Sequence, residues 1–130
     1  MTQQRLERVN HIHITVPTEA LSAARHFYCD VIGLTEVPKP EELTVYPGFW
    51  LQLDGLQLHV GGEDNAVDRW ASGAHIAIQV EDLEERRSRL QAFGVALKEM
   101  VFYPGFERFE YRDPFGNRME LIMTKKGGEG

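Results

Sequence analysis

The second half of the chain repeats a pattern of the first half, and this repeat limits the fold more than any other feature. The segment NHIHITV at residues 10–16 aligns with AHIAIQV at residues 74–80, so that His75 lies 64 residues after His11. Apolar residues alternate with polar ones in both segments, which is typical of a half-buried strand. The sequence therefore predicts two related units, each of which opens with a strand.

A helix is expected to follow each of these strands. Thr18 and Asp82 are good N-cap residues at the same offset, and Asp82 with Glu85 resembles a capping box. Gly33 and Gly94 are the predicted C-terminal stops. Between these limits an apolar stripe recurs at helical spacing. It consists of Ala20, Ala24, Phe27, Tyr28 and Val31 in the first half and, more sparsely, of Leu83, Leu90 and Phe93 in the second.

Each half ends in a hairpin that follows a shared Tyr-Pro-Gly-Phe tag, at residues 46–49 and 103–106. The first hairpin is expected to turn at Asp54 and Gly55. The second is expected to turn over residues 113–117, a longer loop made of residues that favour turns. Each unit therefore consists of a strand, a helix and about three further strands.

The chain has the length of one domain, with 130 residues of which 42% are hydrophobic. The two units are expected at about residues 9–60 and 74–123, with a polar, glycine-bearing linker at 61–73. Residues 125–130 are expected to form a disordered tail because of their Lys, Gly and Glu composition. Neither unit can cover its own sheet, so we expect a single α+β domain in which the two units pack together.

Composition and charge exclude several kinds of partner. The net charge is −6, and the Lys and Arg residues are scattered, which argues against a nucleic-acid partner. No run approaches the roughly 18 apolar residues of a membrane span, and the N-terminal segment is polar. We therefore expect a cytoplasmic protein with a small-molecule substrate and no membrane partner. The single cysteine, Cys29, excludes an intramolecular disulfide and a cysteine-type zinc site.

Four residues that can bind a metal ion occupy equivalent places in the two halves. His11 and His75 open the first strands, and His59 and Glu120 each lie four residues beyond a turn glycine in the last strands. All four occupy polar positions in the alternating pattern of their strands, so they lie on the face opposite the apolar side chains. If an approximate two-fold axis relates the halves, these four positions can converge on it. They would then bring imidazole nitrogens and one carboxylate oxygen together at a single site. A single strand histidine is more often a hydrogen-bonded or surface group, but the joint placement favours a metal site.

Other polar and aromatic residues are candidates for contacts around that site. His13 shares the phase of His11, so we expect it to line the same cavity, as a substrate contact, a base or an alternative ligand. Arg108 and Glu110 share one face of the strand before the last turn. Both are candidate substrate-binding residues, with Arg108 for an anionic substrate group, and the alternative for both is an ordinary surface ion pair. Trp50 and Trp70 are expected to be packing or interface aromatics.

Four segments of the chain are similar to those of a known superfamily. They are VNHIHI at 9–14, HFYCDVIGL at 26–34, AHIAI at 74–78 and DPFGNRMEL at 113–121. Together they resemble the vicinal oxygen chelate superfamily over residues 9–123. That superfamily includes glyoxalase I, fosfomycin-modifying enzymes, methylmalonyl-CoA epimerase, extradiol dioxygenases and bleomycin-resistance proteins.

The resemblance implies two pseudo-symmetric βαβββ modules that form a cupped mixed sheet, with one divalent metal ion (Zn, Ni, Mn or Fe(II)) and often a homodimer. The metal positions of the superfamily fall on His11, His75 and Glu120. The fourth falls on or near His59, where glyoxalase I has a glutamate. We expect a lyase or isomerase in which the metal chelates two neighbouring substrate oxygens, while Glu120 or His13 moves a proton.

Two alternatives stay open. In the first, His11, His75 and Glu120 hold Fe(II) for extradiol-type dioxygenase chemistry, and His59 stays off the metal. In the second, the protein binds no metal and sequesters a cationic drug as bleomycin-resistance proteins do, which the net charge of −6 permits. The four ligand-competent residues in register argue against the second alternative.

Overall fold

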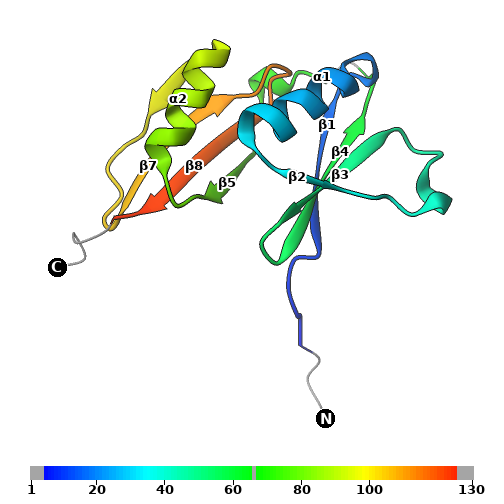
Figure 1. The fold of residues 1–130 in the computed structure, drawn as a ribbon, viewed down its shortest axis with the longest axis horizontal. Helices are drawn as coiled ribbons and strands as arrows, with labels where there is room; N and C mark the ends of the chain where they lie inside the picture. Colours follow the sequence, from blue (N-terminus) through cyan, green and yellow to red (C-terminus); the bar gives the residue numbers. More distant parts are fainter. Residues whose placement is uncertain (1–4, 66, 126–130) are drawn as a thin grey trace.

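Two four-stranded sheets lie side by side in the computed structural model, which describes residues 5–65 and 67–125 (Figure 1). The strand order is β1-β4-β3-β2 in the first sheet and β5-β8-β7-β6 in the second. In each sheet the first strand pairs in parallel with the last, and the other pairs are antiparallel. The predicted α+β fold of two βαβββ modules is confirmed.

The same succession of elements occurs in both modules. The strands of the first module are β1 (His11–Val16), β2 (Thr35–Val37), β3 (Gly48–Leu53) and β4 (Leu56–Gly62). Those of the second are β5 (His75–Gln79), β6 (Leu97–Glu99), β7 (Phe106–Arg112) and β8 (Arg118–Thr124). The main helices are α1 (Leu21–His26), which continues into a π-helical segment η2 (Phe27–Ile32), and α2 (Leu83–Phe93). Short 3₁₀ turns occupy η1 (Thr18–Ala20), η3 (Glu41–Leu43) and η4 (Arg69–Ala71).

Strand register makes the last strands of the two modules equivalent. His13 of β1 lies opposite His59 of β4. Ala77 of β5, which occupies the place of His13 in the repeat, lies opposite Glu120 of β8. A shift of one residue would turn either side chain to the other face of its sheet. The predicted equivalence of His59 and Glu120 is therefore a property of the fold.

Three of the four predicted capping residues lie at helix ends, as expected. The Asp82 side chain accepts a hydrogen bond from the Glu85 backbone N–H at 3.1 Å and begins α2. Gly33 and Gly94 end the helical segments, both at φ 95°, a left-handed conformation that glycine adopts without strain.

The predicted N-cap at Thr18 is wrong. The segment after Pro17 first forms the 3₁₀ turn η1, and α1 begins only at Leu21 without a side-chain cap. The Thr18 side chain packs instead against Gly62 of β4, where a Cβ would lie 2.5 Å from its Oγ1. Its hydroxyl therefore accepts no hydrogen bond from a helix N-terminus.

The linker is shorter than predicted because β4 continues through Gly61 and Gly62, which lie opposite Thr15 and Val16. A Cβ at Gly61 would lie 2.6 Å from the end of the His13 ring, so glycine at this position leaves room for that ring. Residues 126–130 of the predicted tail lie outside the described residues.

Between the sheets and the two helices lies the core, and both helices cover the same side of the sheets (Figure 1). Its largest buried side chains include Phe27, Tyr28, Phe49 and Phe109. Phe93, predicted in the apolar stripe, is 44% exposed at the end of α2.

Among residues 5–65 and 67–125, every helix is too short or too polar to span a membrane.

The turn at residues 113–117 fastens the second module to the first. Asp113 is fully buried and accepts a hydrogen bond from the Tyr28 hydroxyl of the first module. The Asn117 amide donates to the backbone carbonyl of Thr15 at 2.9 Å. This turn therefore sets how the two sheets sit relative to each other, a role that turn propensity alone does not reveal.

Candidate metal site

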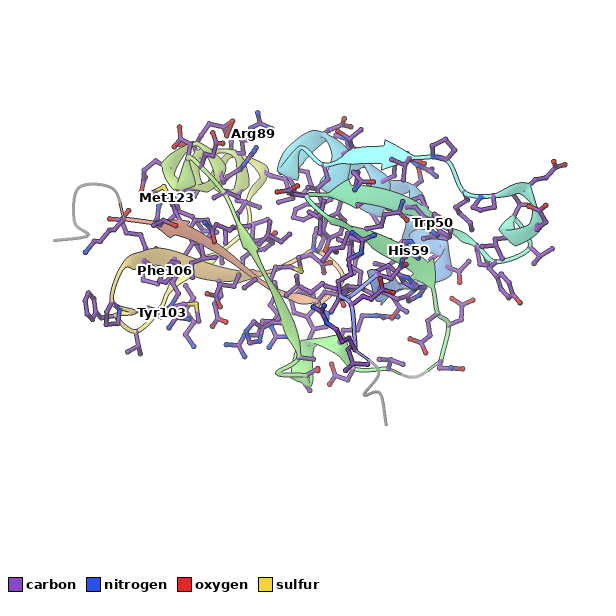
Figure 2. All side chains as sticks on the ribbon, turned by 90° about the horizontal axis from the view of Figure 1, so that it is seen from below. Trp50, His59, Arg89, Tyr103, Phe106 and Met123 are labelled. Carbon is purple, nitrogen blue, oxygen red and sulfur yellow. The ribbon has the colours of Figure 1, made fainter. Side chains whose placement is uncertain are left out.

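Strands β1, β3 and β4 present polar side chains to a cavity of about 360 Å³ on the first sheet. His11 and His13 both line it, as the strand phase predicts, and so do Trp50 and His59. Figure 2 shows Trp50 and His59 close together on neighbouring strands. The cavity therefore contains three of the five histidines of the chain.

The His59 ring is held between two other rings. The Trp50 ring lies 3.9 Å from it at an interplanar angle of 1°, and the His11 ring lies 4.2 Å from it at 15°. His59 Nε2 is 3.0 Å from Gln57 Oε1. With the Gln57 amide in this orientation, Nε2 donates the hydrogen bond and Nδ1 carries the lone pair of the neutral ring.

Burial, and to a smaller extent the nearby His11, His13 and Lys39, together lower the pKa of His59 to about 4. The ring is therefore neutral at pH 7. A neutral imidazole is the form that binds a metal ion. The low pKa agrees with a ligand role for His59, but it also agrees with a ring that is only packed.

On β1 the His11 ring is oriented by its neighbour. Its Nδ1 lies 2.9 Å from Asn10 Oδ1, which leaves Nε2 for another partner. The His13 ring lies over Gly61, where a side chain would displace it. These contacts hold two imidazoles at the cavity of the first module without using all of their nitrogen atoms.

The second module carries a histidine and a carboxylate at the equivalent places. His75 Nδ1 is 3.1 Å from the Gly73 carbonyl, so it donates there and leaves the lone pair on Nε2. That Nε2 lies 3.7 Å from Oε1 of Glu120, which is buried. The other carboxylate oxygen, Oε2, accepts a hydrogen bond from Arg108 at 3.2 Å.

The donors of this pair fit a divalent metal ion. A separation of 3.7 Å is too long for a hydrogen bond. Two ligands about 2.1 Å from one tetrahedral ion lie about 3.4 Å apart, close to this value. A metal-bound histidine usually donates its second ring nitrogen to an oxygen, as His75 does to Gly73 and His11 does to Asn10. Imidazole and carboxylate ligands suit Zn, Mn and Fe(II).

One chain does not bring the four predicted ligands together. Within residues 5–65 and 67–125, no three His, Cys, Asp or Glu side chains lie close enough to hold one metal ion. His11 lies with His59 on the first sheet, and His75 lies with Glu120 on the second. The reason is the side-by-side arrangement of the sheets, which leaves two separate pairs of candidate ligands in each chain (Figure 1).

Arg108 and Glu110 do not pair with each other. Arg108 donates to Glu120 and to the Val101 carbonyl, and its guanidinium lies 5.0 Å from the centre of the Tyr103 ring. It is therefore placed to orient Glu120.

The carboxylate of Glu110 bonds instead to Arg118, with Lys98 at 3.5 Å. Burial raises the pKa of Glu110, but these two cations outweigh that effect and hold it below its usual value. Glu110 therefore stays charged and paired at neutral pH.

Two other residues that line the cavity, Gln57 and Lys39, were not among the predicted site residues. Gln57 lies two residues before His59 on β4, so the alternation of the strand could have indicated it. Lys39 comes from the loop between β2 and β3, and no sequence signal places it there. Trp70 lies away from this cavity and packs on Gly116, where a Cβ would meet the indole at 2.9 Å.

The fold agrees with comparisons to known proteins. The model of the Glyoxalase/Bleomycin resistance protein/Dioxygenase superfamily matches residues 8–121. A Bacillus anthracis protein assigned to the glyoxalase family shares 32% identity, with a TM-score of 0.85, over 95% of this chain and 100% of that one. A search of curated protein sequences gives no significant match.

More distant structures share the fold. FosX, a fosfomycin resistance protein from Listeria monocytogenes, in complex with Mn(II) and sulfate has 19% identity and a TM-score of 0.74, covering 96% of each chain. A FosX variant in complex with Mn(II) and 1S,2S-dihydroxypropylphosphonic acid has 20% identity and a TM-score of 0.77, covering 95% of this chain and 97% of that one. The chain belongs to the Glyoxalase/Bleomycin resistance protein/Dioxygenase superfamily, which includes metal-dependent enzymes.

Proposed function

We propose that this protein is a metal-dependent enzyme of lyase or isomerase type that acts on a small substrate with two neighbouring oxygens. The ligands are His11, His75 and Glu120, with His59 as the fourth. The observation that carries the proposal is the pair formed by His75 and Glu120, in which Nε2 and Oε1 lie 3.7 Å apart while each side chain is oriented by another hydrogen bond. The Mn(II) complexes of FosX support metal use in proteins of this fold.

The complete site is formed in a homodimer, because each chain supplies only two pairs of ligands. The first pair of one copy faces the second pair of its partner. Two loops support this assembly, since each exposes apolar side chains that a second copy can cover. Val45 and Tyr46 are 77% and 66% exposed in the first module, and Val101 and Phe102 are 83% and 72% exposed in the second.

A divalent ion at this site would supply a Lewis acid that stabilises negative charge on the substrate oxygens. The side chains do the rest of the chemistry. Glu120 is the proposed proton carrier, with its Oε2 held by Arg108. His13 is the alternative base, because its ring lines the same cavity as His11.

The assembly can be tested with two inactive variants. His11→Ala and His75→Ala are expected to lose metal binding as separate homodimers. A mixed dimer of the two variants can be purified with two different tags. If each site takes ligands from both chains, one of its two sites combines the two unaltered pairs and stays intact. The mixed dimer should bind about half of the wild-type metal. A mixed dimer that binds none while remaining dimeric would contradict the shared site.

Activity can be tested with a panel of hemithioacetals, α-hydroxy thioesters and epoxides after loading with Zn, Ni, Mn or Fe(II) in turn. Turnover that depends on metal and is lost in Glu120→Gln supports the proposal. Proton exchange at the substrate carbon that survives Glu120→Gln would move the base role to His13.

An extradiol-type dioxygenase is the second candidate. It is favoured by the contacts of His59, whose Nε2 lies against Gln57 and whose ring is stacked between two others. In this candidate function His59 is a packed side chain and not a metal ligand. His11, His75 and Glu120 would then form the triad of two histidines and one carboxylate that holds Fe(II). Turnover of catechols alone, with Fe(II) and oxygen, would favour this candidate over the lyase or isomerase.

A further inference from the structure

The cavity of the first module has a basic lining in an acidic protein. Its ionisable side chains are Lys39, Tyr46 and the histidines at 11, 13 and 59, and among the described residues no Asp or Glu lines it. The whole chain has 20 acidic residues against 14 Lys and Arg, so composition alone does not produce this lining. A pocket that contains an ammonium group and no carboxylate favours an anion.

Lys39 is fixed at the wall of this cavity. Its Nζ donates a hydrogen bond to the backbone carbonyl of Tyr46, which belongs to the loop before β3. An ammonium group has three donors, so two remain for a ligand.

The remaining lining is largely apolar and aromatic. Leu43, Pro47 and Trp50 contribute to it, and the Trp50 ring stacks on His59. A cavity of about 360 Å³ can hold a molecule of substrate size. The combination fits a small ligand with one anionic group and a flat or apolar body.

In the proposed dimer, Glu110 and Glu120 of the partner copy would face this cavity, but they do not neutralise the charge of Lys39. Glu110 is paired with Arg118, and Glu120 is paired with Arg108. Each acid therefore has a cation of its own, and Lys39 keeps its charge for a ligand.

We propose that this cavity binds the carboxylate or phosphonate group of the substrate, with Lys39 as its counter-ion and Trp50 against its apolar body. This inference rests on the proposed function, because it takes the ligand of the cavity to be the substrate of the adjoining metal site. It also opposes the alternative of a protein that sequesters a cationic drug.

The test uses four probes of similar shape and different charge: benzoate, phenylphosphonate, neutral benzamide and cationic benzamidine. Binding is followed in metal-free dimeric protein, prepared on a chelating resin, by Trp50 fluorescence in a Trp70→Phe background. Benzoate or phenylphosphonate should bind at millimolar concentration, benzamide at least about tenfold more weakly, and benzamidine not at all. The two anions separate a carboxylate site from a phosphonate site.

Lys39→Met should weaken binding of the anionic probe at least about tenfold and leave benzamide unchanged. Arg89→Met is the control for loss of a positive charge, since Arg89 lies on α2 and pairs with Glu85, outside the cavity lining, and it should keep wild-type affinity. Tighter binding of benzamidine than of benzoate, wild-type binding by Lys39→Met, or binding of no probe would each overturn the inference.

A Mn(II) titration of the wild-type protein, set beside its anion binding, distinguishes the two proposals. Metal binding without anion binding in the wild-type protein would overturn the inference and leave the metal site standing. Anion binding without metal binding would support the anion site but remove the proposed function.

Discussion

Tyr28 of the first module donates a hydrogen bond to Asp113 of the second, and both residues are fully buried. Asp113 also accepts bonds from the backbone N–H groups of Phe115 and Asn117, at 2.9 Å and 2.8 Å. The carboxylate is thus satisfied by the turn that contains it and by a residue 85 positions earlier in the chain. A buried carboxylate is tolerated only with such partners.

Tyr28→Phe is therefore expected to destabilise the protein by about 1–3 kcal/mol, because it leaves a buried carboxylate with one donor fewer. Tyr111→Phe is the matched control. The Tyr111 hydroxyl is buried without a hydrogen-bond partner in the described residues, so its removal should be neutral or stabilising. Urea unfolding of both variants measures the difference. Equal losses of stability would contradict the special role of Tyr28.

The same tyrosines predict a loss of stability at alkaline pH. Burial raises the pKa of Tyr28 and of Tyr111, and the charge of Asp113 raises both further. A raised pKa stabilises the fold below about pH 10, the unfolded value, and this contribution is lost as the pH rises above it. The free energy of unfolding should fall by up to about 1.4 kcal/mol per pH unit for each tyrosine. Tyr111→Phe should make the decline shallower, and an unchanged slope would rule out Tyr111 as a source.

Two strand glycines should respond differently to alanine. Gly48 has φ 147°, and a Cβ there would lie 2.2 Å from the Val60 carbonyl oxygen, so the backbone must move. We expect Gly48→Ala to cost about 3 kcal/mol or more. At Gly61 a Cβ meets only the end of the His13 ring, which can rotate away.

Gly61→Ala should therefore change stability by less than about 1 kcal/mol. It should nevertheless displace His13, which histidine NMR signals and turnover would report. An unchanged His13 signal would contradict the contact. A folded, fully stable Gly48→Ala protein would contradict the strain predicted for that site.

Three histidine variants separate ligands from other roles in the proposed site. His75→Ala should weaken Mn(II) binding by at least about 100-fold, measured by calorimetry, because it removes a proposed ligand. His13→Ala should keep metal affinity but lower turnover. His26→Ala is the control, since His26 is exposed on α1 and paired with Asp30. Wild-type metal affinity in His75→Ala would remove it from the ligand set.

The repeat in the sequence was enough to predict the two βαβββ modules and their strand faces. Alternation of polar and apolar residues fixes which side chains face the core, and Gly33, Gly94 and Asp82 mark helix ends by local chemistry. These signals are local, so they can be read without the fold. The prediction at Thr18 failed because its side chain packs against Gly62 of β4, a contact between residues that are distant in the sequence.

Sequence position also placed His59 and Glu120 at equivalent points, since register follows from the same alternation. It could not show that one chain separates the His11 and His59 pair from the His75 and Glu120 pair. That separation depends on how the two sheets sit side by side.

Only the tertiary structure decided which side chains meet across long distances in the chain. Lys39 lines the cavity from a loop without periodicity, Arg108 bonds to Glu120 rather than to Glu110, and Tyr28 reaches Asp113. Local patterns report on the two faces of a strand. Contacts between elements depend on how the two modules pack, and a single sequence does not encode that packing as a local pattern.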